Sequence, residues 1–206
     1  MDVRLVFRED ALSRVKMPDS EIERAKDRKN GSSTPVALAW RGADLDALSD
    51  RILTINLAAS TLVFYAIARI YVLPHLSAWG FRRVMPPILL LHSFRHLGLM
   101  FLTRGATYPG MPSQFAYPAA FGDLIAAVLA FTALIAVVRR SAAARPLVWL
   151  FNVEGTLDLI DAIVLANVYK VPAYMGPAYW IPAFWVPALL VTHYITFRAL
   201  GSSSSV

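Results

Sequence analysis

Three carboxylates lie inside one apolar stretch of the sequence, Trp149 to Asn167 (WLFNVEGTLDLIDAIVLAN). Glu154, Asp158 and Asp161 are separated by four and three residues, a spacing that places them on one stripe of an α-helix. The stretch has the length and apolarity of a membrane-spanning helix. Because a carboxylate that faces lipid hydrocarbon costs several kcal/mol, we expect the stripe to face the protein interior or a water-filled cavity.

Five further ionisable groups interrupt other apolar segments. His92, Arg95 and His96 occur in LLLHSFRHLGLMF, and their i, i+3 and i+4 spacing predicts one face of a helix. Asp123 follows in the next apolar segment, and His193 lies in LLVTHYITF near the C-terminus. Ionisable residues within membrane helices usually pair with one another and mark functional pathways. We therefore predict an ion or proton path through these residues and the three acids of the Trp149 to Asn167 stretch.

Counting residues from the helix ends predicts which of these groups share a depth. Arg95 and His96 are expected at the depth of Asp123, in the same half of the membrane as Asp158 and Asp161. We expect Arg95 to pair with Asp123 or with an acid of the fourth apolar segment, because a guanidinium cannot readily lose its charge. The other half is expected to hold the remaining groups, Glu154, His92 and His193.

These residue types support two kinds of chemistry. Carboxylates and imidazoles exchange protons and would suit a relay or a small-cation site. Alternatively, His92 and His96 have the spacing of two ligands to one metal ion, with His193 or an acid completing the shell. A haem held by His92 and His193 is a further alternative. The motifs of hydrolases, nucleotide-binding proteins and zinc proteases are absent from the sequence.

Five apolar segments are long enough to cross a bilayer, which needs about 20 residues each. They cover roughly residues 52–74, 84–103, 117–138, 146–167 and 177–198. In the third, Ala119, Gly122, Ala126 and Ala130 form a small-residue face suited to close helix contact. The predicted fold is therefore an all-α polytopic transmembrane bundle of about five spans, occupying residues 52–200.

The first 51 residues differ in composition from the rest. Residues 1–35 are highly charged and end in Gly-Ser-Ser-Thr-Pro, which predicts a flexible charged tail. Residues 36–51 are expected to lie at the membrane interface, with Trp40 and Arg41 at the level of the lipid headgroups.

Composition excludes several classes of protein. The chain has 206 residues, 57% of them apolar, and contains no cysteine, so disulfides, thiol nucleophiles and iron–sulfur clusters are excluded. The net charge of +6 does not indicate nucleic-acid binding, because most basic residues outside the tail flank the apolar segments. The expected partners are the lipid bilayer and either further copies of the chain or a larger membrane complex.

The loop charges predict an orientation. Four basic residues near the spans share a side with the N-terminus and six share a side with the C-terminus, namely Arg41, Arg51, Arg104 and Lys170 against Arg82, Arg83, Arg139, Arg140, Arg145 and Arg198. By the positive-inside rule, this count places the C-terminus in the cytoplasm. The basic tail, if it counts, favours the reverse.

Four segments resemble small uncharacterised bacterial multi-pass inner-membrane proteins. They are HSFRHLGLMF, FAYPAAFGDLIAAVLA, NVEGTLDLIDA and IPAFWVPALLVTHYITF, and the resemblance covers most of residues 85–200. It implies an inner-membrane helical protein and carries no function. The hypotheses from the residues are proton or small-cation translocation or proton-coupled transport, a metalloenzyme or haem protein, and a non-catalytic subunit of a membrane complex.

Overall fold

The structure is a computed structural model that describes residues 35–202. Residues 45–206 form one compact unit, and the helical bundle and its polar interior lie in the described part of this unit. Apart from Pro35, the tail predicted for residues 1–35 lies outside the described residues. The predicted interfacial segment, residues 36–51, is not a separate element, because helix α2 (Pro35–Ile67) runs through it into the first apolar segment.

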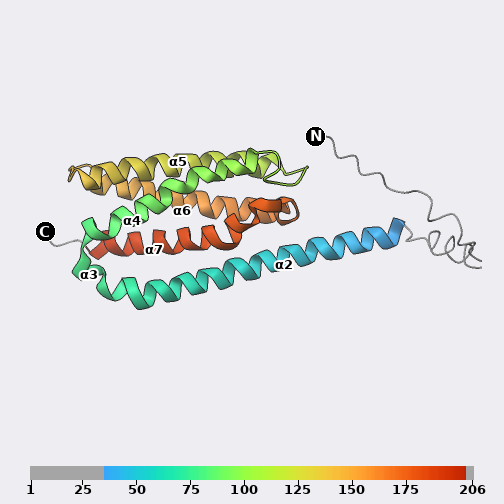
Figure 1. Cartoon of the computed structure of the whole chain (residues 1–206), viewed down its shortest axis with the longest axis horizontal. Coiled ribbons are helices and arrows are strands. Elements are labelled where there is room, and N and C mark those ends of the chain that lie inside the picture. The colour runs from blue at the N-terminus through green and yellow to red at the C-terminus, as the bar shows by residue number, and fades with distance from the viewer. Residues whose placement is uncertain (1–34, 203–206) are drawn as a thin grey trace, which may run out of the picture. The chain divides into compact units, whose positions relative to one another are not determined.

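All regular elements of the described chain are helical (Figure 1). After α2, the first span continues as a π-helix, η2 (Ala68–Val72), a 3₁₀ turn, η3 (Leu73–His75), and α3 (Leu76–Trp79). The second consists of α4 (Phe81–Ser93) and a 3₁₀ helix, η4 (Phe94–Leu102). Then come α5 (Ser113–Val138), α6 (Ala144–Val168), the short helices η5 (Val171–Tyr174), η6 (Gly176–Tyr179) and η7 (Ile181–Trp185, a π-helix), and α7 (Val186–Ser202).

The predicted all-α bundle is confirmed, and its helices are of membrane-crossing length. Four helical stretches of the described chain are long and apolar enough to cross a membrane: Arg51–Trp79, Phe81–Leu102, Ser113–Val138 and Gly176–Gly201. Helix α6 is also long, at 25 residues, but its acidic residues make it less apolar than these four stretches. Because α6 packs against both α5 and α7, it completes a bundle of five long helices.

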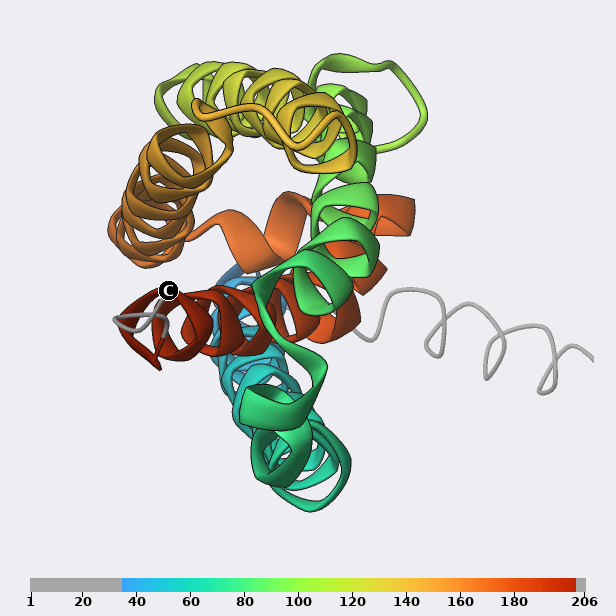
Figure 2. The same cartoon turned by 90° about the vertical axis from the view of Figure 1, so that its left-hand side faces the viewer.

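Small side chains let the central helices approach closely. Helix α5 packs against α4, η4 and α6, and its residues Ala119, Ala126 and Ala130 are almost completely buried. The predicted small-residue face is therefore confirmed at these alanines. Viewed along the bundle, α4, α5, α6 and α7 surround a common interior (Figure 2).

The first span packs loosely on the outside of α7 and η7. Phe64 meets Phe184 with ring centroids 5.2 Å apart, and Tyr65 meets Tyr194 at 6.0 Å. Between Arg51 and Trp79, the buried residues are Leu53, Ala68 and Leu76. The remaining apolar surface of this span is of the kind that lipid covers in a membrane.

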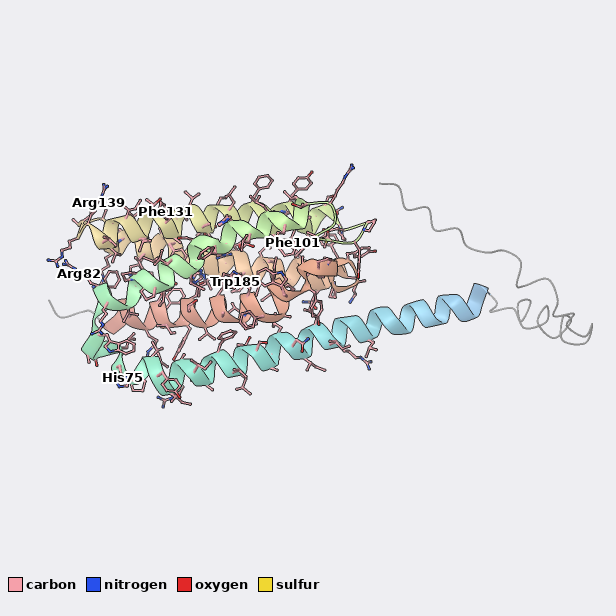
Figure 3. All side chains as sticks on the ribbon, viewed as in Figure 1. His75, Arg82, Phe101, Phe131, Arg139 and Trp185 are labelled. Carbon is pink, nitrogen blue, oxygen red and sulfur yellow. The ribbon has the colours of Figure 1, made fainter. Side chains whose placement is uncertain are left out.

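The two ends of the bundle differ in character. At the loop end, segments 103–112 and 169–180 are joined by backbone hydrogen bonds from Tyr108 N to Tyr174 O (2.9 Å) and from Ala178 N to Ala106 O (2.8 Å). The opposite end, here called the arginine end, exposes Arg82, Arg83, Arg139 and Arg140. Figure 3 shows Arg82 and Arg139 together at this end.

Candidate functional site

Arg95 is the centre of a buried network of charges. Its side chain starts on η4 and is 1% exposed. The guanidinium donates from Nε to Asp123 Oδ1 on α5 (2.7 Å), from Nη1 to the Gly155 carbonyl on α6 (3.1 Å), and from Nη2 to Asp158 Oδ2. Arg95 therefore binds two carboxylates on two helices. The predicted pairing of Arg95 with an acid of the third or fourth apolar segment is confirmed.

The change from α-helix to 3₁₀ helix at Phe94 decides which polar residues of this span face inward. A 3₁₀ helix has about three residues per turn, so Arg95 stays in line with His92 while His96 turns roughly 120° away. His92 and Arg95 are buried, whereas His96 is exposed and bonds through Nδ1 to the Ser93 carbonyl of its own span. The prediction that His96 shares a face and a half-site with Arg95 and Asp158 is therefore wrong.

Three glycines make room for the charged side chains. A Cβ added to Gly98 would collide with the Asp123 carboxylate, and one added to Gly122 would collide with that of Asp158. At Gly155, a Cβ would lie 2.7 Å from Arg95 Nη1. Thus η4, α5 and α6 each have a glycine at the point where a charged side chain from one of the other two elements packs against the backbone.

Two buried histidines continue the network toward the arginine end. His92 and His193 are at most 1% exposed, and their ring centroids are 4.3 Å apart. The ring of Phe151 packs against both, at 4.9 Å from His92 and 5.2 Å from His193. His193 also adjoins Arg95, because its Nε2 lies 2.9 Å from the position that a Cβ of Gly155 would take.

The hydrogen bonds of Thr192 indicate which ring nitrogen of His92 carries a proton. Its Nε2 is 2.8 Å from Thr192 Oγ1, and that hydroxyl already donates its hydrogen to the carbonyls of Ala188 or Leu189. When the hydroxyl donates to one of these carbonyls, its oxygen accepts from His92 Nε2. In a neutral ring, His92 Nδ1 then carries a lone pair, and this buried atom has no hydrogen-bond partner among the described residues.

His193 is oriented in the same manner. Its Nδ1 is 2.8 Å from Asn152 Oδ1, which can only accept, so Nδ1 is the donor. Nε2 is then the lone-pair nitrogen, and it too is buried without a partner in the described part of the chain. Each imidazole is therefore held through one nitrogen and leaves the other without a partner among the described residues.

Asp123 connects this network to a cavity. A cavity of about 170 Å³ is lined mainly by apolar side chains of α2, η4, α5, α6 and η7, with Asp123 in its wall. Asn167 and Pro172 border it at the loop end. We call the group formed by His92, Arg95, Asp123, Asn152, Asp158, Thr192 and His193 the polar core.

The acids of α6 occupy three different environments. Asp158 is paired with Arg95, Glu154 is half-buried, and Asp161 is exposed. The prediction that the whole stripe faces inward is therefore wrong for Asp161. The buried Leu159 marks the inner face of α6. Because successive residues of an α-helix are rotated by about 100°, Asp158 lies about 100° around the helix from Leu159, whereas Asp161 lies about 160° from it, on the opposite side. Asp158 reaches inward from the edge because Gly122 leaves space for it.

The polar core does not fit the predicted metal shell or a haem. With His96 outside, no group of three or more His, Asp or Glu side chains in the described residues is arranged around a common metal position. Two imidazoles on one haem iron need ring centroids roughly 6 Å apart, since metal–nitrogen bonds are about 2.0 Å. The rings of His92 and His193 are closer than this, at 4.3 Å, and Phe151 packs against both.

The model of one protein family, described as Domain of unknown function (DUF8737), matches residues 52–201. The chain belongs to this family. No curated protein and no solved structure matches the chain. The DUF8737 region contains the whole polar core and the wall of the cavity, whereas the charged N-terminal segment lies outside it.

Sequence reasoning missed several residues of the DUF8737 region that shape the site. Asn152 and Thr192, which bond to His193 and His92, were not among the predicted site residues. Gly98 and Gly155 were also missed, although Gly155 follows Glu154 directly and Gly98 lies three residues after Arg95. A glycine costs about 1 kcal/mol in a helix interior, so a glycine near a charged residue in an apolar helix is a signal for close approach.

Proposed function

We propose that the protein translocates protons across a membrane through its polar core, alone or coupled to a small solute. The observation that carries this proposal is the pair of buried ring nitrogens, His92 Nδ1 and His193 Nε2, both left without partners among the described residues. A buried polar atom without a partner costs about 1–3 kcal/mol. A reversible protonation site would explain why the fold tolerates two.

The order of groups along the bundle supports a relay. From the loop end, the cavity leads to Asp123, Arg95 joins Asp123 to Asp158, His193 adjoins Arg95 over Gly155, and His92 packs against His193. We infer that a proton passes between the carboxylates and the imidazoles. Arg95 keeps its charge throughout, because a guanidinium is not deprotonated in proteins, and it holds the carboxylates in position.

The path is blocked toward the arginine end in this structure. Beyond His92, toward the arginine end, the interior is filled by buried apolar side chains, among them Met85, Leu89, Val148 and Ile195. Translocation therefore requires a second arrangement in which this layer opens. The 3₁₀ segment η4 and the π-helix η7 border the polar core and the cavity, and such irregular helical segments often mark functional hinges or sites.

We place the protein in the bacterial inner membrane with the C-terminus in the cytoplasm, on the basis of the exposed arginines at the arginine end. Five helices form a small transporter. We therefore expect it to act as a homo-oligomer or within a larger membrane complex.

The test is proton flux into liposomes that contain the purified protein. Asp158→Asn and His193→Gln should abolish pH-driven flux, because each removes a proton-carrying group of the polar core. The controls are Asp161→Asn, which changes an exposed acid of the same helix as Asp158, and His96→Gln, which changes an exposed histidine of η4. Both should leave flux unchanged.

Thermal unfolding of each variant in detergent separates transport from helix locking. A non-catalytic subunit would use the polar core only for stability. In that case, Asp158→Asn and His193→Gln would lower the melting temperature yet retain wild-type flux per folded molecule, or the wild type would show no flux. Either result would end the transport hypothesis.

A further inference from the structure

The cavity beside Asp123 has the size of a binding site for a small organic molecule. Its volume is about 170 Å³, slightly larger than an apolar cavity of roughly 150 Å³ that accommodates benzene. It therefore suits a ligand of roughly six to ten non-hydrogen atoms. An entire lipid or a large drug would not fit without rearrangement.

The cavity extends from the loop end to about the middle of the bundle. Along α6 its wall runs from Asn167 to Leu159, which is roughly 12 Å at about 1.5 Å per residue. Leu53, Thr54 and Leu57 of the loosely packed first span close one side. The cavity is thus bordered by a helix that can move with few broken contacts.

The charge of the wall lies at the inner end. Phe101, Phe115 and Ile181 are typical of its apolar lining, whereas Asp123 is the charged residue in its wall. Arg95 donates to Asp123 Oδ1, and no hydrogen bond from the described residues reaches Asp123 Oδ2. One carboxylate oxygen thus remains able to accept another hydrogen bond.

The charges at this end are not balanced. The guanidinium of Arg95 carries one positive charge and is shared between the carboxyl groups of Asp123 and Asp158. When both carboxyl groups are ionised, the trio has one negative charge in excess. Buried charge is tolerated when it is paired, so either a proton or a bound monocation would balance the trio.

We propose that this cavity binds a small organic monocation, an amine with an apolar body, whose ammonium group contacts Asp123. The inference that an amine binds here rests only on the cavity and on the charge balance of the trio. The identification of the amine as the solute that exchanges with protons rests on the proposed function. An amine and a proton would then compete for the same excess negative charge, which is a direct physical basis for coupling their movements.

Benzylamine is a suitable probe because it combines one ammonium group with an apolar ring and has eight non-hydrogen atoms. Calorimetric titration of the purified full-length protein in detergent should show saturable binding. Benzyl alcohol and toluene serve as neutral analogues of similar size and should bind at least about tenfold more weakly, since they lack the charge-assisted hydrogen bond.

Two variants test the site by different routes. Asp123→Asn removes the charge and should weaken benzylamine binding at least about tenfold. Ala162→Leu fills the cavity without altering the trio, because Ala162 lies in its wall, and should also abolish binding. Ala142→Leu, at an exposed alanine of the arginine end, is the matched control and should bind as the wild type does.

Several results would overturn the inference. Absence of saturable benzylamine binding would do so, as would equal binding of toluene, which would indicate an apolar site such as one for a lipid chain. Retained binding in folded Ala162→Leu would place the amine elsewhere. Amine binding without proton flux would support this inference and refute the proposed function. Proton flux without amine binding would support the proposed function and refute this inference.

Discussion

Arg95 on η4 and His193 on α7 meet over the backbone of Gly155 on α6. A Cβ at Gly155 would lie 2.7 Å from Arg95 Nη1 and 2.9 Å from His193 Nε2, and the Gly155 carbonyl accepts a hydrogen bond from Arg95. A single residue without a side chain therefore brings the ion-pair half and the histidine half of the polar core together.

Replacement of Gly155 by alanine should separate these two halves. The added methyl group must displace Arg95 or His193, and overpacking of an interior usually costs about 1–3 kcal/mol. We expect a lower melting temperature in detergent and reduced proton flux. Gly201→Ala is the control, because a Cβ at this exposed position of α7 meets nothing within 4 Å and alanine favours helix. Equal melting temperatures for the two variants would contradict the close approach at Gly155.

Arg95→Lys should not preserve the site, although it preserves the charge. Arg95 contacts Asp123, Asp158 and the Gly155 carbonyl through three separate nitrogens, whereas lysine has one ammonium group. A carboxylate left without its partner in an interior costs roughly 3–5 kcal/mol, so the melting temperature should fall substantially. Arg69→Lys, at an exposed arginine of the first span, should have little effect.

A compensated variant can show that this loss of stability is electrostatic. The triple substitution Arg95→Met, Asp123→Asn and Asp158→Asn removes the cation and both anions together. Replacement of a complete buried ion-pair group by neutral residues is often neutral or stabilising. We expect the triple variant to melt at a higher temperature than Arg95→Lys but to lack flux. A triple variant less stable than Arg95→Lys would argue against unpaired carboxylates as the cause.

The sequence was sufficient to predict the helices and the partner of Arg95. Long apolar segments predict spans on length alone, and the high cost of an unpaired buried guanidinium left few candidates beyond Asp123 and Asp158. Both bind it. The small residues of α5 likewise predicted where helices would pack closely, because close packing depends directly on side-chain size.

Errors arose where the backbone departs from an ideal α-helix or where the inner face was unknown. The spacing of His92 and His96 predicts a shared face only if the α-helix continues, and it becomes 3₁₀ at Phe94. The acids of α6 are regularly spaced, but whether each one faces the interior or the outside depends on which neighbouring helices cover α6. Since those neighbours are set by tertiary packing, the exposure of Asp161 could not be read from its spacing.

Cysteine labelling can test both the number of crossings and the orientation, because the chain contains no cysteine of its own. Ser113 and Ser141 are exposed residues at opposite ends of α5, so single substitutions Ser113→Cys and Ser141→Cys report on the two ends of one helix. The arginine end should face the cytoplasm, since Arg82, Arg83, Arg139 and Arg140 are exposed there.

In intact bacterial spheroplasts, a membrane-impermeant maleimide should label Ser113→Cys at once and Ser141→Cys only after the membrane is permeabilised. The reverse pattern would place the loop end, toward which the cavity extends, on the cytoplasmic side. Labelling of both positions from one side would show that α5 does not cross the membrane. That outcome would also remove the reason for a path through the polar core, because its groups would then not connect two compartments.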